Sequence, residues 1–176
     1  ITINGTVDSD STPRDLSLNG GTGGVLLVTG AVGSTKALDT LTVTNSGGAT
    51  FQSTVDAATV AISDSSASTT VAFQDDLTVT TGMTVANTAN AYNVSITGSS
   101  NSIGSSTTFN NTGDVTLGND ATDVTYFNGS LSTAGRNQAN STFTGGFIRT
   151  PGAGITLDRV SALANTTIDT TNNGAN

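Results

Sequence analysis

The side chains in this sequence that could carry out chemistry are almost all aspartates. The 176 residues include 13 acidic residues, every one of them Asp, and no His or Cys. The commonest general base and most nucleophile pairs are therefore absent. Because the chain has no Trp and only two Tyr to act as sugar platforms, we expect no enzymatic activity. Paired carboxylates alone can hydrolyse glycosides, and the pairs close in sequence are Asp8 with Asp10, Asp75 with Asp76, and Asp120 with Asp123.

The same aspartates could bind Ca²⁺, which takes roughly six to eight oxygen ligands. The first candidate segment is GNDATD, with Asp120 and Asp123, and the second is VDSD, with Asp8 and Asp10. Neither segment matches an EF-hand loop or a calcium-binding nonapeptide. A turn aspartate that accepts hydrogen bonds from nearby backbone N–H groups is the simpler interpretation. Both interpretations stay open at this stage, and no other cofactor is expected.

Closely spaced threonines raise a different binding hypothesis, because regular hydroxyl rows on a flat solenoid face could order water and bind ice. That hypothesis requires Thr-x-Thr at the same place in turn after turn, whereas TLTVT, TTVAF and DVTYF shift in register. A groove lined by both Tyr92 and Tyr126 would likewise favour a ligand-binding module. A module for ice, calcium or polysaccharide is therefore the alternative function. The simpler interpretation is that Thr forms the wet outer faces of strands.

The composition favours strands and turns. Apolar residues make up 34% of the chain, which is low for an ordinary core. Disorder is disfavoured, because charged residues are only 10% and Pro only 2. The complete absence of Glu and the abundance of Asn, Asp, Thr, Ser and Gly disfavour helices.

The distribution of charge and of apolar residues argues against two classes of partner. The net charge is -8, and the five basic residues are scattered singly. We therefore expect no nucleic-acid partner. No apolar run approaches the ~20 residues that a membrane helix needs, so we expect no membrane insertion.

One phrase, an apolar residue followed four positions later by another, recurs along the chain. The intervals between its first residues are 25, 23, 22, 36, 18 and 16 residues, which indicates a loose period of about 20. The first residues are Ile3, Val28, Phe51, Phe73, Phe109, Phe127 and Phe143.

Short alternating segments such as LTV, VAI and VSI lie between these phrases and predict strands with one buried face. A right-handed parallel β-solenoid of about eight or nine coils explains the recurrence, because equivalent residues then stack in ladders. A β-sandwich is the alternative fold. The solenoid predicts that Phe51, Phe73, Phe109, Phe127 and Phe143 are largely buried.

The segment LSLNGGTGGVLLVTGAVGSTKALDTLTVTNSGGATFQSTVDAATV, residues 16–60, resembles the β-strand repeat units of large bacterial surface proteins, a group that grades into filamentous-haemagglutinin-like and autotransporter-like adhesins. The resemblance implies residues 1–176 as a single solenoid repeat unit of a longer array or fibre. It also implies an extracellular location at the bacterial cell surface and a structural or adhesive role.

The two ends of the chain suggest how such units are joined. The sequence opens on ITINGTV, a strand phrase like the interior ones, and closes on TNNGAN, a turn. We expect copies to associate head to tail, either covalently or as separate chains, through pairing of the first strand with an open solenoid end. The predicted assembly strand consists of Ile1, Thr2, Ile3, Asn4, Gly5, Thr6 and Val7.

Overall fold

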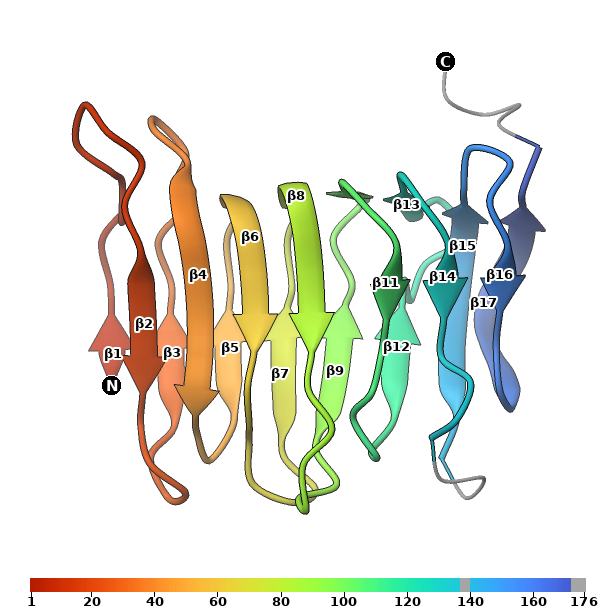
Figure 1. Ribbon diagram of the computed structural model, residues 1–176, viewed down its shortest axis with the longest axis horizontal. Helices are drawn as coiled ribbons and strands as arrows, with labels where there is room; N and C mark the ends of the chain where they lie inside the picture. Colours follow the sequence, from red (N-terminus) through yellow and green to blue (C-terminus); the bar gives the residue numbers. More distant parts are fainter. Residues whose placement is uncertain (137–139, 172–176) are drawn as a thin grey trace.

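The computed structural model of the chain describes residues 1–136 and 140–171. Every regular element in these residues is a β-strand. The strands wind into a right-handed parallel β-solenoid of about seven turns, drawn with its long axis horizontal in Figure 1. The predicted all-β solenoid is therefore confirmed, with slightly fewer turns than expected. Most of the closing turn TNNGAN, residues 172–176, lies outside the described residues.

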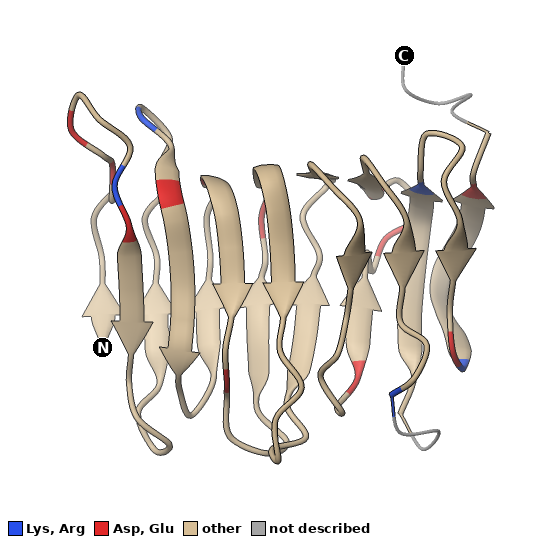
Figure 2. Ribbon diagram, in the orientation of Figure 1, with Lys and Arg blue, Asp and Glu red and all other residues tan. Residues whose placement is uncertain are grey.

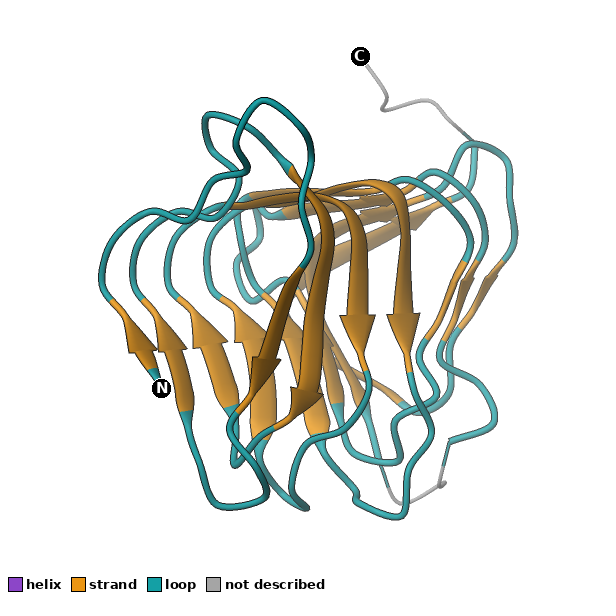
Figure 3. Cartoon of the chain, turned by 60° about the vertical axis from the view of Figure 1, so that its left-hand side comes forward, coloured by secondary structure: helices purple, strands orange, loops and turns teal. Residues whose placement is uncertain are grey.

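Each of the first six turns contributes one strand to each of two parallel layers. The first layer contains β1 (Thr2–Ile3), β3 (Leu26–Val28), β5 (Ala49–Phe51), β7 (Thr70–Phe73), β9 (Asn93–Ile96) and β12 (Val115–Leu117). The second layer contains β2 (Leu16–Asn19), β4 (Leu38–Asn45), β6 (Val55–Ile62), β8 (Leu77–Val85), β10 (Ser100–Ile103) and β13 (Val124–Phe127). Figure 3 shows the two layers meeting around the interior.

The two layers are joined at the C-terminal end by a strand that turns the corner. The first half of β15 (Thr142–Arg149) pairs with β12 and its second half pairs with β13. β17 (Val160–Asp169) then pairs along both halves of β15. A third sheet contains β11 (Thr107–Thr108), β14 (Leu131–Ser132) and β16 (Ile155–Thr156).

The third sheet continues the C-terminal halves of the long strands β4, β6 and β8. Residues 77–79 of β8 lie next to β10, whereas Val85 at the other end of β8 bridges to Phe109, directly after β11. In the pairing of β6 with β8, a register shift between Ala57 and Thr59 places one extra residue in β8 between its two halves. The solenoid therefore has three sides. The long strands β4, β6 and β8 each run along two of these sides, the second layer and the side that the third sheet continues.

The length of a turn varies along the first layer. Paired residues are separated by as few as 18 positions, from Thr142 to Val160, and by as many as 27, from Val115 to Thr142. The first intervals predicted from the sequence are correct, because Ile3 pairs with Val28, Val28 with Phe51 and Phe51 with Phe73.

The later intervals were wrong because three separate ladders were mistaken for one. After Phe73 the ladder continues to Ile96, an aliphatic residue that the phrase did not capture. Phe127 instead pairs with Ile103 in the second layer, and Phe109 pairs with Val85. Any apolar side chain can fill such an inward position, so Phe alone does not mark the ladder.

Four of the five predicted core phenylalanines are buried. Phe51 and Phe73 stack with ring centroids 5.0 Å apart, and Phe109 and Phe127 make an edge contact at 6.4 Å. The prediction for Phe143 is wrong, because its side chain is only half-buried and lies on the outer side of β15. The neighbouring residues Thr142 and Thr144 face inward instead.

A glycine corner follows these residues in β15. Gly146 has φ +71°, and a Cβ atom there would overlap the carbonyl of Asp123 on the preceding turn. Phe147, on the far side of this corner, also faces outward, and the Arg149 guanidinium lies 4.5 Å from its ring centroid. The interior of the last turns is consequently more polar than the sequence predicted.

Candidate functional site

The predicted assembly strand lies at one open end of the solenoid, at the left in Figure 1. Among the described residues, β1 pairs with β3 alone. The Ile1 ammonium group donates to the Val25 carbonyl at 2.7 Å, yet the Ile1 side chain stays 56% exposed. The carbonyls of Ile1 and Ile3 accept hydrogen bonds from the N–H groups of Leu27 and Thr29, so the N–H and C=O of Thr2 face the free edge. Of the seven predicted residues, Ile3 and Val7 are half-buried and the others are exposed.

The opposite end of the solenoid exposes the inward side of β17. Val160 pairs with Thr142, and Ile168 pairs with Ile148, so both side chains continue inward ladders of the interior. Thr142 and Ile148 are fully buried, whereas Val160 is 46% exposed and Ile168 is 47% exposed. The exposure arises because, among the described residues, no further turn covers β17. Both ends of the apolar interior are therefore open.

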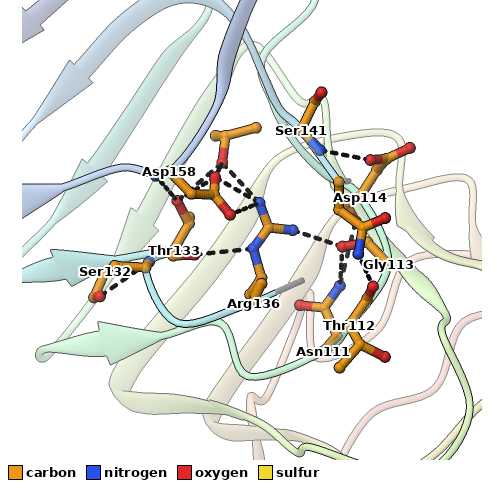
Figure 4. Close-up of polar contacts among 12 residues, drawn as sticks. Asn111, Thr112, Gly113, Asp114, Ser132, Thr133, Arg136, Ser141 and Asp158 are labelled. Carbon is orange, nitrogen blue, oxygen red and sulfur yellow. Dashed lines mark hydrogen bonds and ion pairs between the residues drawn. The ribbon is translucent and has the colours of Figure 1, made fainter. Parts of the chain in front are cut away.

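A polar cluster lies inside the last turns, centred on Arg136 (Figure 4). The Arg136 side chain is 1% exposed and its guanidinium is bonded on every side. Nε donates to the Thr133 carbonyl at 3.0 Å, and Nη1 donates to the Gly113 carbonyl at 2.6 Å. Nη2 donates to Thr142 Oγ1 at 2.9 Å and to Asp158 Oδ1 at 2.8 Å. One side chain thus ties three successive turns together.

The partner of this cation is Asp158, which is largely buried. Its Oδ1 also accepts hydrogen bonds from Thr142 at 2.6 Å and from Thr133 at 3.1 Å. Burial alone would raise the pKa of Asp158, but the hydrogen bonds and the charge of Arg136 outweigh it and lower the pKa below 3.8. Asp158 Oδ2 lies 2.8 Å from Nη2 in an ion pair but outside hydrogen-bond geometry. The Arg136 guanidinium and the hydroxyls of Thr133 and Thr142 already donate to groups within the chain. We therefore interpret the cluster as structural.

The first candidate calcium segment is folded into a compact turn. Asp123 is buried, and its Oδ2 accepts the backbone N–H groups of Asn119 and Asp120, each at 2.9 Å. Asp120 is exposed, and its Oδ1 accepts both the N–H and the hydroxyl of Thr122. The backbone hydrogen bond from Thr122 lowers the pKa of Asp120 most, followed by its hydroxyl. These contacts match the turn interpretation.

The second candidate segment does not bring its carboxylates to a common point. Asp8 accepts the backbone N–H groups of Thr35 and Lys36 on the next turn. Asp10 pairs with Arg14, with Oδ2 2.9 Å from Nη2, and this hydrogen bond lowers the pKa of Asp10. No group of three or more acidic residues that could hold a metal ion occurs in the described part of the chain.

The remaining candidate residues are also separated or engaged. Asp75 and Asp76 each accept a backbone N–H of the chain around them. Tyr92 is fully buried, its hydroxyl donates to the Ala86 carbonyl at 2.7 Å, and burial raises its pKa. Tyr126 lies on the outer side of β13, so the two tyrosines do not line one groove.

The Arg136–Asp158 pair is not apparent from the sequence. The two residues are separated by 22 positions, and both stand in segments that read as ordinary polar turns. No sequence signal marked the pair, because the inward position of Thr142 beside Arg136 follows only from the stacking of the turns.

Searches of known protein families, of curated proteins and of solved structures find no match to this chain. Within the described residues no helix is long and apolar enough to cross a membrane. The fold and the open ends are therefore the features on which a functional proposal rests.

Proposed function

We propose that this chain is a structural and adhesive unit of an extracellular bacterial surface fibre or giant adhesin, in which copies stack head to tail. The observation that carries the proposal is the open apolar interior at both ends, with Ile1 exposed at one end and Val160 and Ile168 at the other. In the single chain these apolar side chains are exposed at both ends. A further coil stacked on each end would bury them.

Backbone geometry supports the same contact. The free edge of β1 offers the N–H and C=O of Thr2, and the outer edge of β17 is unpaired within the described chain. Pairing of these edges extends the parallel layer by one strand, as in β-strand addition. Because the two surfaces differ, the contact is heterologous and does not close, so it propagates into a fibre.

The same geometry suits either covalent or separate units. A further coil of the same polypeptide or the first turn of a second copy presents equivalent strands to β17. The resemblance of residues 16–60 to repeat units of bacterial surface proteins supports the extracellular location and the adhesive role.

The test is assembly of the purified chain, followed by sedimentation velocity and negative-stain electron microscopy. Thr2→Pro removes the N–H at the free edge without removing a hydrogen bond to β3. Ile168→Lys places a charge in the open interior. We expect both variants to sediment as monomers under conditions in which the parent chain forms filaments.

The matched control is Ser161→Lys, which adds the same charge to β17 on its outer side, beside Phe143. It should assemble as the parent does. A parent chain that stays monomeric at all concentrations would contradict assembly between separate copies. Equal assembly by a chain lacking residues 1–7 would contradict the role of the first strand.

A further inference from the structure

The third side of the solenoid carries a row of outward hydroxyl groups, here called the hydroxyl row. Ser17 pairs with Thr42, Thr42 with Ala61, and Ala61 with Thr84. The bridge between Val85 and Phe109 then places Thr84 beside Thr108, which pairs with Ser132 and through it with Thr156. The complete row is Ser17, Thr42, Ala61, Thr84, Thr108, Ser132 and Thr156. Every member but Ala61 carries a hydroxyl.

Further small side chains lie beside this row. Thr40 pairs with Thr59, and Thr59 with Gly82, two positions before their counterparts in the hydroxyl row. Adjacent strands are separated by about 4.8 Å, and alternate residues of one strand by roughly 6.7 Å. Over β4, β6 and β8 the face therefore repeats in two directions, along the solenoid axis and along each strand.

Most of these hydroxyls are available to an outside partner. Ser17 bonds Thr44 at 2.9 Å, and Ser132 accepts the N–H of Ala134 at 3.3 Å. Within the described chain, the hydroxyls of Thr42, Thr84, Thr108 and Thr156 make no side-chain hydrogen bond. Because β-branched side chains have few χ1 rotamers, these hydroxyl and methyl groups hold fixed positions.

The face is also free of charge, although the chain has a net charge of -8. Figure 2 shows that acidic and basic residues lie at its margins and at the ends of the solenoid, while the strands at the front stay uncoloured over most of their length. Asp39 at the start of β4 is one such marginal residue. A shallow hollow of about 350 Å³ opens on the same face between β8 and β11, and its lining includes Thr84, Ser106 and Thr108.

We propose that the hydroxyl row and its neighbouring threonines bind the surface of ice. A hydroxyl both donates and accepts hydrogen bonds, so a fixed two-dimensional array holds a first layer of water in regular positions. The repeat distances of the array are comparable to oxygen repeat distances in ice, and the methyl groups occupy the spaces between. The absence of charged side chains leaves that water layer undisturbed.

A polysaccharide fits this face less well. Sugar rings stack on aromatic side chains, and the hydroxyl row contains none. The face also runs along the side of the solenoid, away from Ile1 and β17. The proposal therefore stands independently of head-to-tail assembly.

The experiment measures thermal hysteresis and inhibition of ice recrystallisation by the purified chain. Thr42→Tyr places a bulky ring in the hydroxyl row on a strand paired on both sides. Its matched control, Thr50→Tyr, makes the same change on the outer side of β5, which is also half-buried and paired on both sides. We expect the parent chain to be active, Thr42→Tyr to lose most of the activity, and Thr50→Tyr to retain it.

Ala61→Thr completes the row and should raise the activity above that of the parent. Circular dichroism melting of each variant checks that the fold is retained.

The proposal is overturned if the parent shows no thermal hysteresis, or if Thr50→Tyr loses as much activity as Thr42→Tyr. Binding to insoluble cellulose without any effect on ice would equally overturn it. Repeating the assay on the Ile168→Lys variant separates this proposal from assembly, because a monomer retains the whole face.

Discussion

At the scale of single residues, the interior is held by a few large side chains. Phe73 is fully buried and lies against Phe51, with nearly parallel rings at an interplanar angle of 6°. Aromatic side chains supply much of the buried area in a chain whose aromatic content is only 5%. The loss of one such ring leaves a cavity that a stacked solenoid cannot close by local collapse.

The first prediction concerns Phe73→Ala. Removing this ring should lower the free energy of unfolding by about 3–5 kcal/mol, as measured by urea denaturation. Phe143→Ala is the matched control, because Phe143 is half-buried on the outer side of β15. It should cost clearly less. Equal costs for the two variants would contradict the inward and outward assignment.

The second prediction concerns Asp158→Asn. This change leaves the buried Arg136 guanidinium without its counter-charge and should lower the free energy of unfolding by about 3–5 kcal/mol at neutral pH. The folded state lowers the pKa of Asp158 from 3.8. Its contribution is therefore fully present above pH 3.8 and is lost as the pH falls through the lower, folded pKa.

Urea denaturation of the parent and of Asp158→Asn between pH 2 and pH 7 checks this sign. The difference between the two should be constant near neutral pH and shrink in acid. Asp10→Asn provides the control, because Asp10 and Arg14 are 60% exposed and their pair is screened by water. A difference that grows in acid would contradict the assignment.

At the scale of elements, aspartate side chains accept backbone N–H groups in the turns between strands. Asp123 closes the turn after β12 through two backbone N–H groups, and Asp8 links the first turn to the second. Such contacts satisfy donors that a tight turn would otherwise leave free.

The third prediction follows from these turns. Addition of EDTA should shift the melting temperature little, because the carboxylates at Asp120 and Asp123 are already hydrogen-bonded to the chain. Differential scanning calorimetry with EDTA and with excess Ca²⁺ is the measurement. A fall of many degrees on chelation would show that the aspartates are calcium ligands.

At the scale of the whole molecule, strand pairing joins each turn only to its neighbours. Stability in such a stack is a sum of turn and interface contributions, so the ends are held on one side only. In the centre, β6 is paired by β4 and by β8 along most of its length.

The fourth prediction is a gradient of hydrogen exchange along the axis. For the monomeric Ile168→Lys variant, amides of β6 should exchange more slowly than amides of β1 and of the outer edge of β17. Mass spectrometry of peptic fragments resolves these segments. Uniform exchange along the axis would indicate that the molecule opens as a single unit.

The sequence by itself determined the strand content, the solenoid and the first three steps of the Phe51–Phe73 ladder. Alternation of apolar residues and the absence of Glu indicated the strands, because both reflect local backbone preference. The recurrent spacing of apolar residues indicated the solenoid and the ladder. Only the tertiary structure decided which strands share a face. Thr84, Thr108, Ser132 and Thr156 follow at intervals of 24 residues, but Ala61 precedes Thr84 by 23 and follows Thr42 by 19. Bulges and loops of unequal length absorb these differences, so the hydroxyl row appears only once the turns are stacked. The same holds for Arg136 and Asp158, whose contact depends on the polar inward side of β15.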